Sequence, residues 1–131
     1  MKATFEAEDA VIGIICGLLL IGYTGHFFSL KLNNYVYVGA FAVFIIFILI
    51  DLAWEFHDLT THFGLIVFSI VHNLIDLVLS LGFISHFSGW NIPYITAYIV
   101  PYLQEPVFMY WAGLFLVIGN AIWLFIFPFA S

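Results

Sequence analysis

Long apolar runs and short polar breaks alternate along this chain. A helix needs about 20 apolar residues to cross the roughly 30 Å hydrocarbon core of a bilayer. Four runs reach that length: about 10–30, 35–57, 64–87 and 106–127. A single helix covering the second and third runs would be roughly 80 Å long. The polar break at 57–62 therefore predicts a tight antiparallel helical hairpin.

The segment of about 92–103 has a different pattern. Tyrosines recur every four residues, at Tyr94, Tyr98 and Tyr102, and Pro101 would kink or end a helix. Such a segment is too short to span a bilayer, and an aromatic row is typical of the headgroup level of a membrane. We therefore expect one short interfacial helix here.

Composition agrees with a membrane protein. Hydrophobic residues make up 65% of the 131 positions and charged residues only 8%, whereas soluble domains carry about 25% charged residues. We expect an all-α, multi-pass, integral membrane four-helix bundle in a single domain, 1–131. Two lysines and no arginine exclude nucleic acid as a partner. Lys2 and Lys31 fall on opposite sides of the predicted membrane, so the positive-inside rule favours neither orientation.

The second apolar run carries an unusual stripe of ionisable residues. Asp51, Glu55, Asp58 and His62 fall within about 60° of one another on an α-helix. The third run adds His72 and Asp76, which also share one face. Ionisable groups inside membrane helices are costly and usually functional, so this pattern predicts a site.

The hairpin sets the register between these residues. If the turn lies near residues 60–63, the numbers of facing residues add up to roughly 124. Asp51 then lies opposite Asn73, and Glu55 lies opposite Ser69. We expect the carboxylates and imidazoles to converge inside the bilayer as one His/carboxylate cluster.

Three kinds of chemistry would use such a cluster. Imidazole and carboxylate groups suit a transition metal ion such as Cu, Zn or Fe, and a cation would offset the clustered negative charge. Graded Asp, Glu and His residues also serve as proton or cation paths. The third interpretation is structural, with hydrogen bonds that fix the hairpin register. The leading hypothesis is a metal site, with these candidate ligands: Asp51, Glu55, Asp58, His62, His72 and Asp76.

One motif resembles a known family. Asp58-x₃-His62 followed by His72 is similar to the Asp-x₃-His…His copper-ligand pattern in the C subunit of particulate methane and ammonia monooxygenases. That pattern also lies on a pair of membrane helices. His72 follows His62 after a shorter gap than the family has, so the resemblance implies metal ligation in general.

Two other histidines suggest an alternative cofactor. His26 and His86 lie at the ends of the first and third runs, which meet on one side of the membrane. Paired histidines on neighbouring helices can ligate a haem from both faces. The competing interpretation places each histidine at the membrane interface as a polar tip, as we also expect for His57.

Small residues predict close helix packing in the first and last runs. Gly13 and Gly17 form a small-xxx-small pair, and Gly113 and Gly119 line a narrow seam on the last run. We expect these residues to pack within the bundle rather than between molecules. Asn120 is expected to donate a hydrogen bond between helices.

The sequence contains no nucleophile elbow, phosphate loop or dinucleotide fingerprint. The leading functional hypothesis is a small integral membrane subunit of a larger complex, redox or metal-dependent, that contributes the His/carboxylate metal site. The alternatives are a homo-oligomeric proton or cation channel or transporter, and a structural scaffold subunit. The expected partners are the lipid bilayer and other membrane subunits or further copies of this chain.

Overall fold

The computed structural model describes the backbone of residues 2–25, 27–57 and 63–130, and the side chains of 8–25, 27–56, 67–122 and 124–125. These residues form helices and no strands, which confirms the predicted all-α class. The helices in chain order are α1 (Lys2–Thr24), α2 (Asn34–His57), α3 (Phe63–Ser88), α4 (Ile95–Tyr98), α5 (Val100–Leu103) and α6 (Pro106–Ala130).

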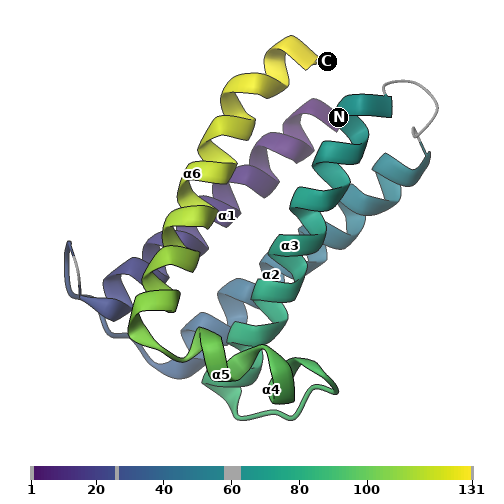
Figure 1. The fold of residues 1–131 in the computed structure, drawn as a ribbon. Helices are drawn as coiled ribbons and strands as arrows, with labels where there is room; N and C mark the ends of the chain where they lie inside the picture. The colour runs from purple at the N-terminus through teal and green to yellow at the C-terminus, as the bar shows by residue number, and fades with distance from the viewer. Residues whose placement is uncertain (1, 26, 58–62, 131) are drawn as a thin grey trace.

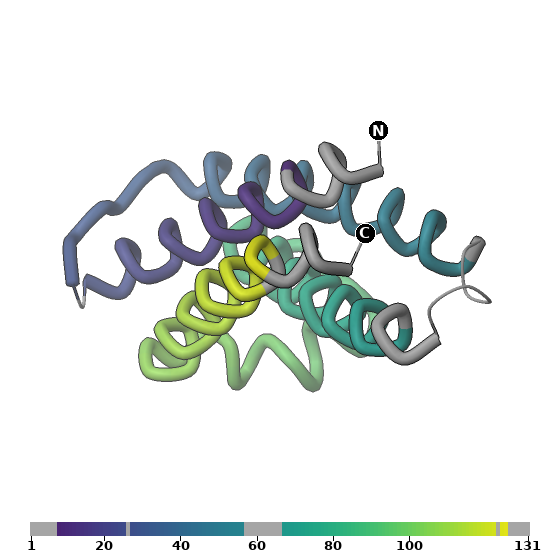
Figure 2. The backbone as a smooth tube through the Cα atoms, turned by 90° about the horizontal axis from the view of Figure 1, so that it is seen from above, coloured from purple at the N-terminus to yellow at the C-terminus, as the bar shows by residue number. Residues whose placement is uncertain are grey.

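The four long helices lie side by side (Figure 1). α1 packs against α6 and α2 packs against α3, each pair antiparallel, and α1 also contacts α2. Helix α1 begins and α6 ends at one end of the molecule, which we call the termini end. The short helices α4 and α5 lie at the opposite end, the loop end. Viewed from above, α1 and α2 lie on one side and α3 and α6 on the other (Figure 2).

Glycines bring α1 and α6 into close contact. A Cβ atom added at Gly17 would lie 2.6 Å from the Gly113 carbonyl oxygen, and one added at Gly113 would lie 2.9 Å from the Gly17 carbonyl oxygen. A Cβ atom at Gly13 would lie 2.4 Å from the Asn120 amide nitrogen. At Gly17 and Gly113 the close neighbour is backbone, which cannot move aside as a side chain can, so glycine is required at these two positions. The predicted small-residue packing within the bundle is confirmed.

Two helices have the length and hydropathy of membrane spans. They cover Asn34–Phe56 and Val67–Ser88 in the described part of the chain, by length and composition alone. In α6 the corresponding apolar stretch is shorter, Pro106–Ile122. The bounds of α2, α3 and α6 lie within a few residues of those predicted.

Helix α1 differs from the predicted span of 10–30. It begins at Lys2, so its first turns include acidic residues, and it ends at Thr24. Gly25 follows with φ of 77°, a left-handed conformation that glycine adopts without steric cost. Its amide donates to the Ile21 carbonyl, and the Leu30 amide donates to the Gly22 carbonyl. These bonds end the helix about six residues earlier than hydropathy alone indicated.

The predicted single helix of about 92–103 is wrong, because the structure has two short helices there. Pro101 has no amide hydrogen with which to continue the bonding of α4, so the chain breaks after Tyr98 and restarts as α5 at Val100. The break keeps Tyr94, Tyr98 and Tyr102 exposed. Leu103 packs inward against α3, where a Cβ atom at Gly82 would lie 2.3 Å from its Cδ1 atom.

Thr96 connects α4 to the end of α3. Its hydroxyl oxygen accepts a hydrogen bond from the Ile92 amide (2.8 Å) and lies 2.7 Å from the Ser85 hydroxyl. Ser85 Oγ also lies 2.7 Å from the Trp90 carbonyl oxygen, to which it donates. These contacts attach the segment from Trp90 to Thr96 to the buried Ser85 side chain of α3.

We expect Thr96→Val to loosen this connection. The substitution removes the acceptor for the Ile92 amide and costs about 1 kcal/mol locally. Hydrogen–deuterium exchange should therefore accelerate at residues 92–99. Tyr98→Phe, which removes only an exposed hydroxyl, is the control and should leave exchange unchanged. Equal exchange in the two variants would contradict the role assigned to Thr96.

Aromatic side chains fill the core toward the loop end. Tyr37 stacks on Phe87 with ring centroids 4.5 Å apart, and Phe41 stacks on Phe83 at 5.3 Å. Phe44 lies one turn further along α2 and is also fully buried. We call these five residues the aromatic half of the core. Both stacked pairs fit the hairpin register predicted from the sequence.

Candidate functional site

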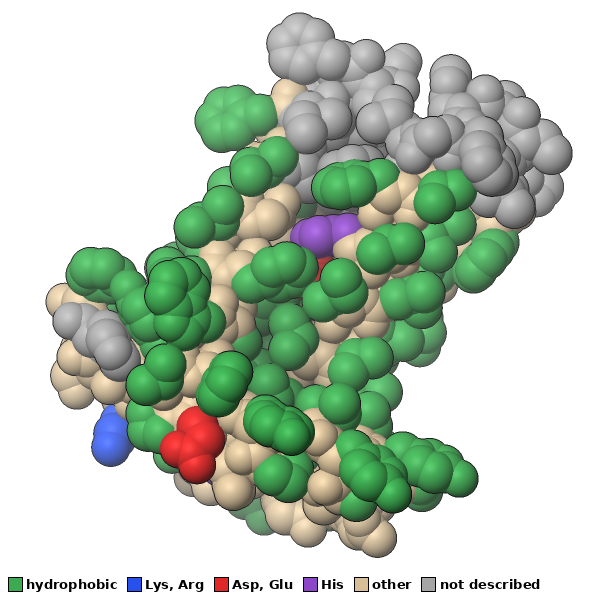
Figure 3. Space-filling model, viewed as in Figure 1, with side chains coloured by type: hydrophobic (Ala, Val, Ile, Leu, Met, Phe, Trp, Pro, Cys, Tyr) green, Lys and Arg blue, Asp and Glu red, His purple; other side chains and the backbone are tan. Residues whose placement is uncertain are grey.

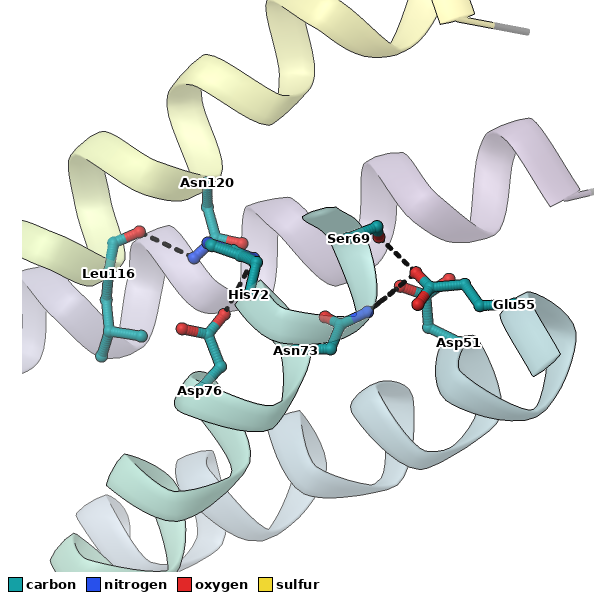
Figure 4. A network of polar contacts seen from close by, with 8 residues as sticks. All are labelled: Asp51, Glu55, Ser69, His72, Asn73, Asp76, Leu116 and Asn120. Atoms are coloured by element: carbon teal, nitrogen blue, oxygen red, sulfur yellow. Dashed lines mark hydrogen bonds and ion pairs between the residues drawn. The ribbon is translucent and has the colours of Figure 1, made fainter. Parts of the chain in front are cut away.

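Two carboxyl groups lie one helical turn apart on α2 and face α3. Asp51 and Glu55 are 1% and 2% exposed. The Asn73 side-chain amide donates to Asp51 Oδ2 at 2.8 Å and to Glu55 Oε1 at 2.9 Å. The Ser69 hydroxyl also donates to Glu55 Oε1. Figure 4 shows these four side chains converging between the two helices, so the predicted pairing of Asp51 with Asn73 and of Glu55 with Ser69 is confirmed.

Electrostatics constrain this acid pair. The two carboxyl groups lie one turn apart on α2 and share the Asn73 amide as donor. Two adjacent carboxylates cannot both ionise readily in a medium of low dielectric constant, because each disfavours the charge of the other. The geometry therefore favours one proton shared by the pair, with Asn73 as a donor to both acids.

His72 and Asp76 form a second polar group on another face of α3. Their atoms Nδ1 and Oδ2 are 3.6 Å apart, and the side chains are 15% and 1% exposed. The imidazole reaches α6, where a Cβ atom at Gly119 would lie 3.0 Å from His72 Nε2. Its ring centroid is 5.8 Å from that of Phe115. Figure 3 shows a histidine in the hollow between α6 and α3, with an acidic side chain behind it.

The four predicted site residues that the structure describes do not form one cluster. Asp51 and Glu55 face Asn73 and Ser69, whereas His72 and Asp76 face α6 (Figure 4). Among the side chains that the structure describes, no three His, Cys, Asp or Glu residues form a group that could hold a metal ion. Residues Asp58 and His62 lie outside the described residues.

Of the other three predicted histidines, the structure describes the side chain of His86 alone. His86 lies near the end of α3, half-buried, with its ring edge-on to Phe87 at 4.9 Å. His26 lies outside the described residues, as does the side chain of His57. The predicted approach of His26 to His86, on which the haem alternative depends, stays a prediction.

Asn120 belongs to α6 and is buried on the side of this helix that faces α1. Its amide donates to the Leu116 carbonyl of its own helix at 2.7 Å. Gly13 of α1 makes room for this amide. The hydrogen bond found for this amide therefore lies within α6, and its predicted role as a donor between helices stays a prediction.

One further buried acid is not among the predicted site residues. Asp9 lies inside α1 and is 4% exposed. A signal was available, because Asp9 precedes Gly13 by one helical turn and so shares the face that carries the predicted packing glycines. Hydropathy does not reveal the burial of Asp9, because the neighbouring acidic residues make this segment polar on average.

The buried polar residues gather in one half of the bundle. Most of them lie toward the start of α1 and α3 and toward the end of α2 and α6, which is the termini end, and Asp76 and Ser80 continue the group past the middle of α3. We call them the polar half of the core: Asp9, Asp51, Glu55, Ser69, Asn73, Asp76, Ser80 and Asn120. The exception in the described residues is Ser85, which belongs to the loop end.

This half of the core combines carboxyl, hydroxyl and amide groups, so it can hold protons, water or small cations in otherwise apolar surroundings. Comparisons of the chain with protein-family models, with curated proteins and with solved structures find no match.

Proposed function

We propose that this chain is a small integral membrane subunit that binds and passes protons or other small cations at the Asp51–Glu55 pair. In this proposal α1, α2, α3 and α6 all span the bilayer, and α4 and α5 lie at its surface. The observation that carries the proposal is the Asn73 amide shared by two buried carboxyl groups. A shared proton in such a pair can be released and replaced without rearranging the helices.

The outer surface supports the membrane assignment. Large apolar side chains are exposed along the long helices, including Ile46 (56%), Phe68 (59%) and Ile118 (53%). Soluble monomers rarely expose apolar area on this scale. At the loop end the exposed side chains are aromatic, which is typical of the headgroup level. They are Trp90, Tyr94, Tyr98, Tyr102 and Trp111.

A flux assay tests the proposal. The protein is reconstituted into liposomes that contain a pH-sensitive dye, and a potential is applied. We expect the Asp51→Asn/Glu55→Gln double variant to lose proton flux by at least about tenfold, which corresponds to a barrier raised by about 1.4 kcal/mol. The amides keep the shape and the acceptor oxygens of the acids but hold no exchangeable acidic proton.

Two controls make the assay specific. Glu105→Gln removes an exposed acid at the loop end and should retain flux. Circular dichroism must show that the double variant is folded. A folded double variant with wild-type flux, or a wild type with no flux, would contradict the proposal and would favour the structural scaffold.

One contact favours a metal site as the second candidate function. Asp76 lies behind Nδ1 of His72, and carboxylates commonly orient metal-binding histidines through the ring nitrogen that does not bind the metal. The metal classes remain those predicted, namely Cu, Zn or Fe. Elemental analysis of purified protein tests this, with stoichiometric metal expected in the wild type and its loss expected in His72→Ala. His86→Ala is the matched control.

Assembly into a larger complex or an oligomer is part of the same proposal. The exposed apolar surface would be covered by lipid, by other membrane subunits or by further copies of this chain. Native mass spectrometry in mild detergent tests it, and we expect a species heavier than one chain.

A further inference from the structure

The core is divided along its length. Polar groups occupy the half toward the termini end, and aromatic rings occupy the half toward the loop end. On α3 the change takes place within one turn, between Ser80 and Phe83, and on α2 it takes place between Asp51 and Phe44. By the register found above, Ser80 lies opposite Phe44, so the polar and aromatic halves meet at that level of the hairpin.

Stacked rings close the aromatic half. Phe41 and Phe83 lie in contact across the hairpin, and Tyr37 and Phe87 form a second layer toward the loop end. Tyr23 of α1 packs edge-on against this second layer, with its ring centroid 5.1 Å from that of Phe87. All four rings of the stacked pairs are at most 5% exposed. Packed rings offer no ligands to a cation that has lost its water.

Two groups at the inner limit of the polar half have no hydrogen-bond partner among the described residues. They are Asp76 Oδ1 and Ser80 Oγ, in side chains that are 1% and 0% exposed. They lie one turn apart on α3 and so share a face. Buried polar atoms without partners are costly, and a small polar guest such as water or a cation would satisfy both.

We propose that the polar half is a one-sided vestibule that small cations enter from the termini end and that the aromatic half closes at the loop end. Asp76 and Ser80 mark its inner limit, and Phe41 and Phe83 form the barrier. This inference rests on the proposed function and adds the direction of access. It predicts that the conformation described here is closed toward one side of the membrane.

Sided labelling with silver ion tests the vestibule. In a Cys16→Ala background, single cysteines are introduced as Ser69→Cys and Ser80→Cys. A thiol binds Ag⁺ and releases a proton, and the silver thiolate no longer reacts with a maleimide added after denaturation. A cleavable tag on the C-terminus identifies the vesicle side that faces the termini end.

We expect Ag⁺ supplied on the termini side to abolish maleimide labelling at both positions, and Ag⁺ supplied on the other side to leave it intact. Ser85→Cys, buried at the loop end, is the matched control and should be protected from neither side. Equal protection from both sides, or none at Ser69→Cys and Ser80→Cys, would overturn the proposal. The result is independent of proton flux, so it can fail while the flux assay succeeds.

The barrier has its own test. Phe83→Ala in the Ser80→Cys protein should allow protection from the loop side as well, because it removes one ring of the Phe41–Phe83 layer. The outer layer formed by Tyr37 stays in place, so the double variant Phe83→Ala/Phe87→Ala should increase loop-side protection further. If a folded double variant still shows protection from the termini side alone, the aromatic half is not the barrier.

Discussion

Replacing Asn73 by alanine should lower the free energy of unfolding by about 3–5 kcal/mol, as removal of one partner from a buried charged group typically does. Its amide is the donor to both Asp51 and Glu55. Without this amide, Glu55 still accepts a hydrogen bond from the Ser69 hydroxyl. Both acids lose their common donor, and they remain buried between two apolar helices. Hydrogen bonds to charged groups contribute about 1.5–3 kcal/mol each, in agreement with this range.

The measurement is reversible unfolding in mixed micelles, followed by circular dichroism. Asn91→Ala, at an exposed position of the loop end, is the matched control and should change stability by no more than about 0.5 kcal/mol. Adding Asp51→Asn to Asn73→Ala should recover part of the lost stability, because it removes one of the two buried acids that have lost their donor. A loss below about 1 kcal/mol for Asn73→Ala would show that the amide does not hold the acid pair.

The second large effect is expected at the contact of α1 and α6. In Gly17→Ala the new methyl group would lie 2.6 Å from the Gly113 carbonyl oxygen and 2.7 Å from Val117 Cγ2. The carbonyl belongs to the backbone and cannot rotate away, so the two helices must separate along their seam. Overpacking of this kind costs about 1–3 kcal/mol and occasionally more.

Gly39→Ala provides the control for this substitution. Gly39 lies inside α2, and a Cβ atom there meets nothing within 4 Å. The same change should therefore stabilise the protein by about 0.5–1 kcal/mol, because alanine favours a helix interior over glycine. Unfolding in mixed micelles measures both variants. If they shift stability in the same direction, the close approach of α1 and α6 is wrong.

The hairpin illustrates what can be predicted without a structure. The bounds of α2 and α3, the pairing of Asp51 with Asn73 and the pairing of Glu55 with Ser69 all follow from the spacing of polar residues and the position of one turn. Two helices joined by a short turn have little freedom along their axes. Their register is therefore set by the chain itself and by helix geometry.

The predicted convergence of the candidate ligands does not hold for the four that the structure describes, and the reason is not local. His72 and Asn73 are neighbours in sequence, but a helix turns about 100° between them. Asn73 therefore faces α2 while His72 faces α6. Which helix covers the second face depends on contacts between segments far apart in sequence, such as Gly119 against His72.

The all-helical class, the extent of the hairpin and the facing positions of its acids and their donors follow from the amino-acid sequence, because helical periodicity and short connections fix these features locally. The burial of Asp9, the direction of His72 and Asp76 toward α6, and the separation of the core into a polar and an aromatic half depend on tertiary contacts. The neighbours of each helix are selected by close packing of small residues such as Gly13, Gly17 and Gly113, and hydropathy carries no information about that fit.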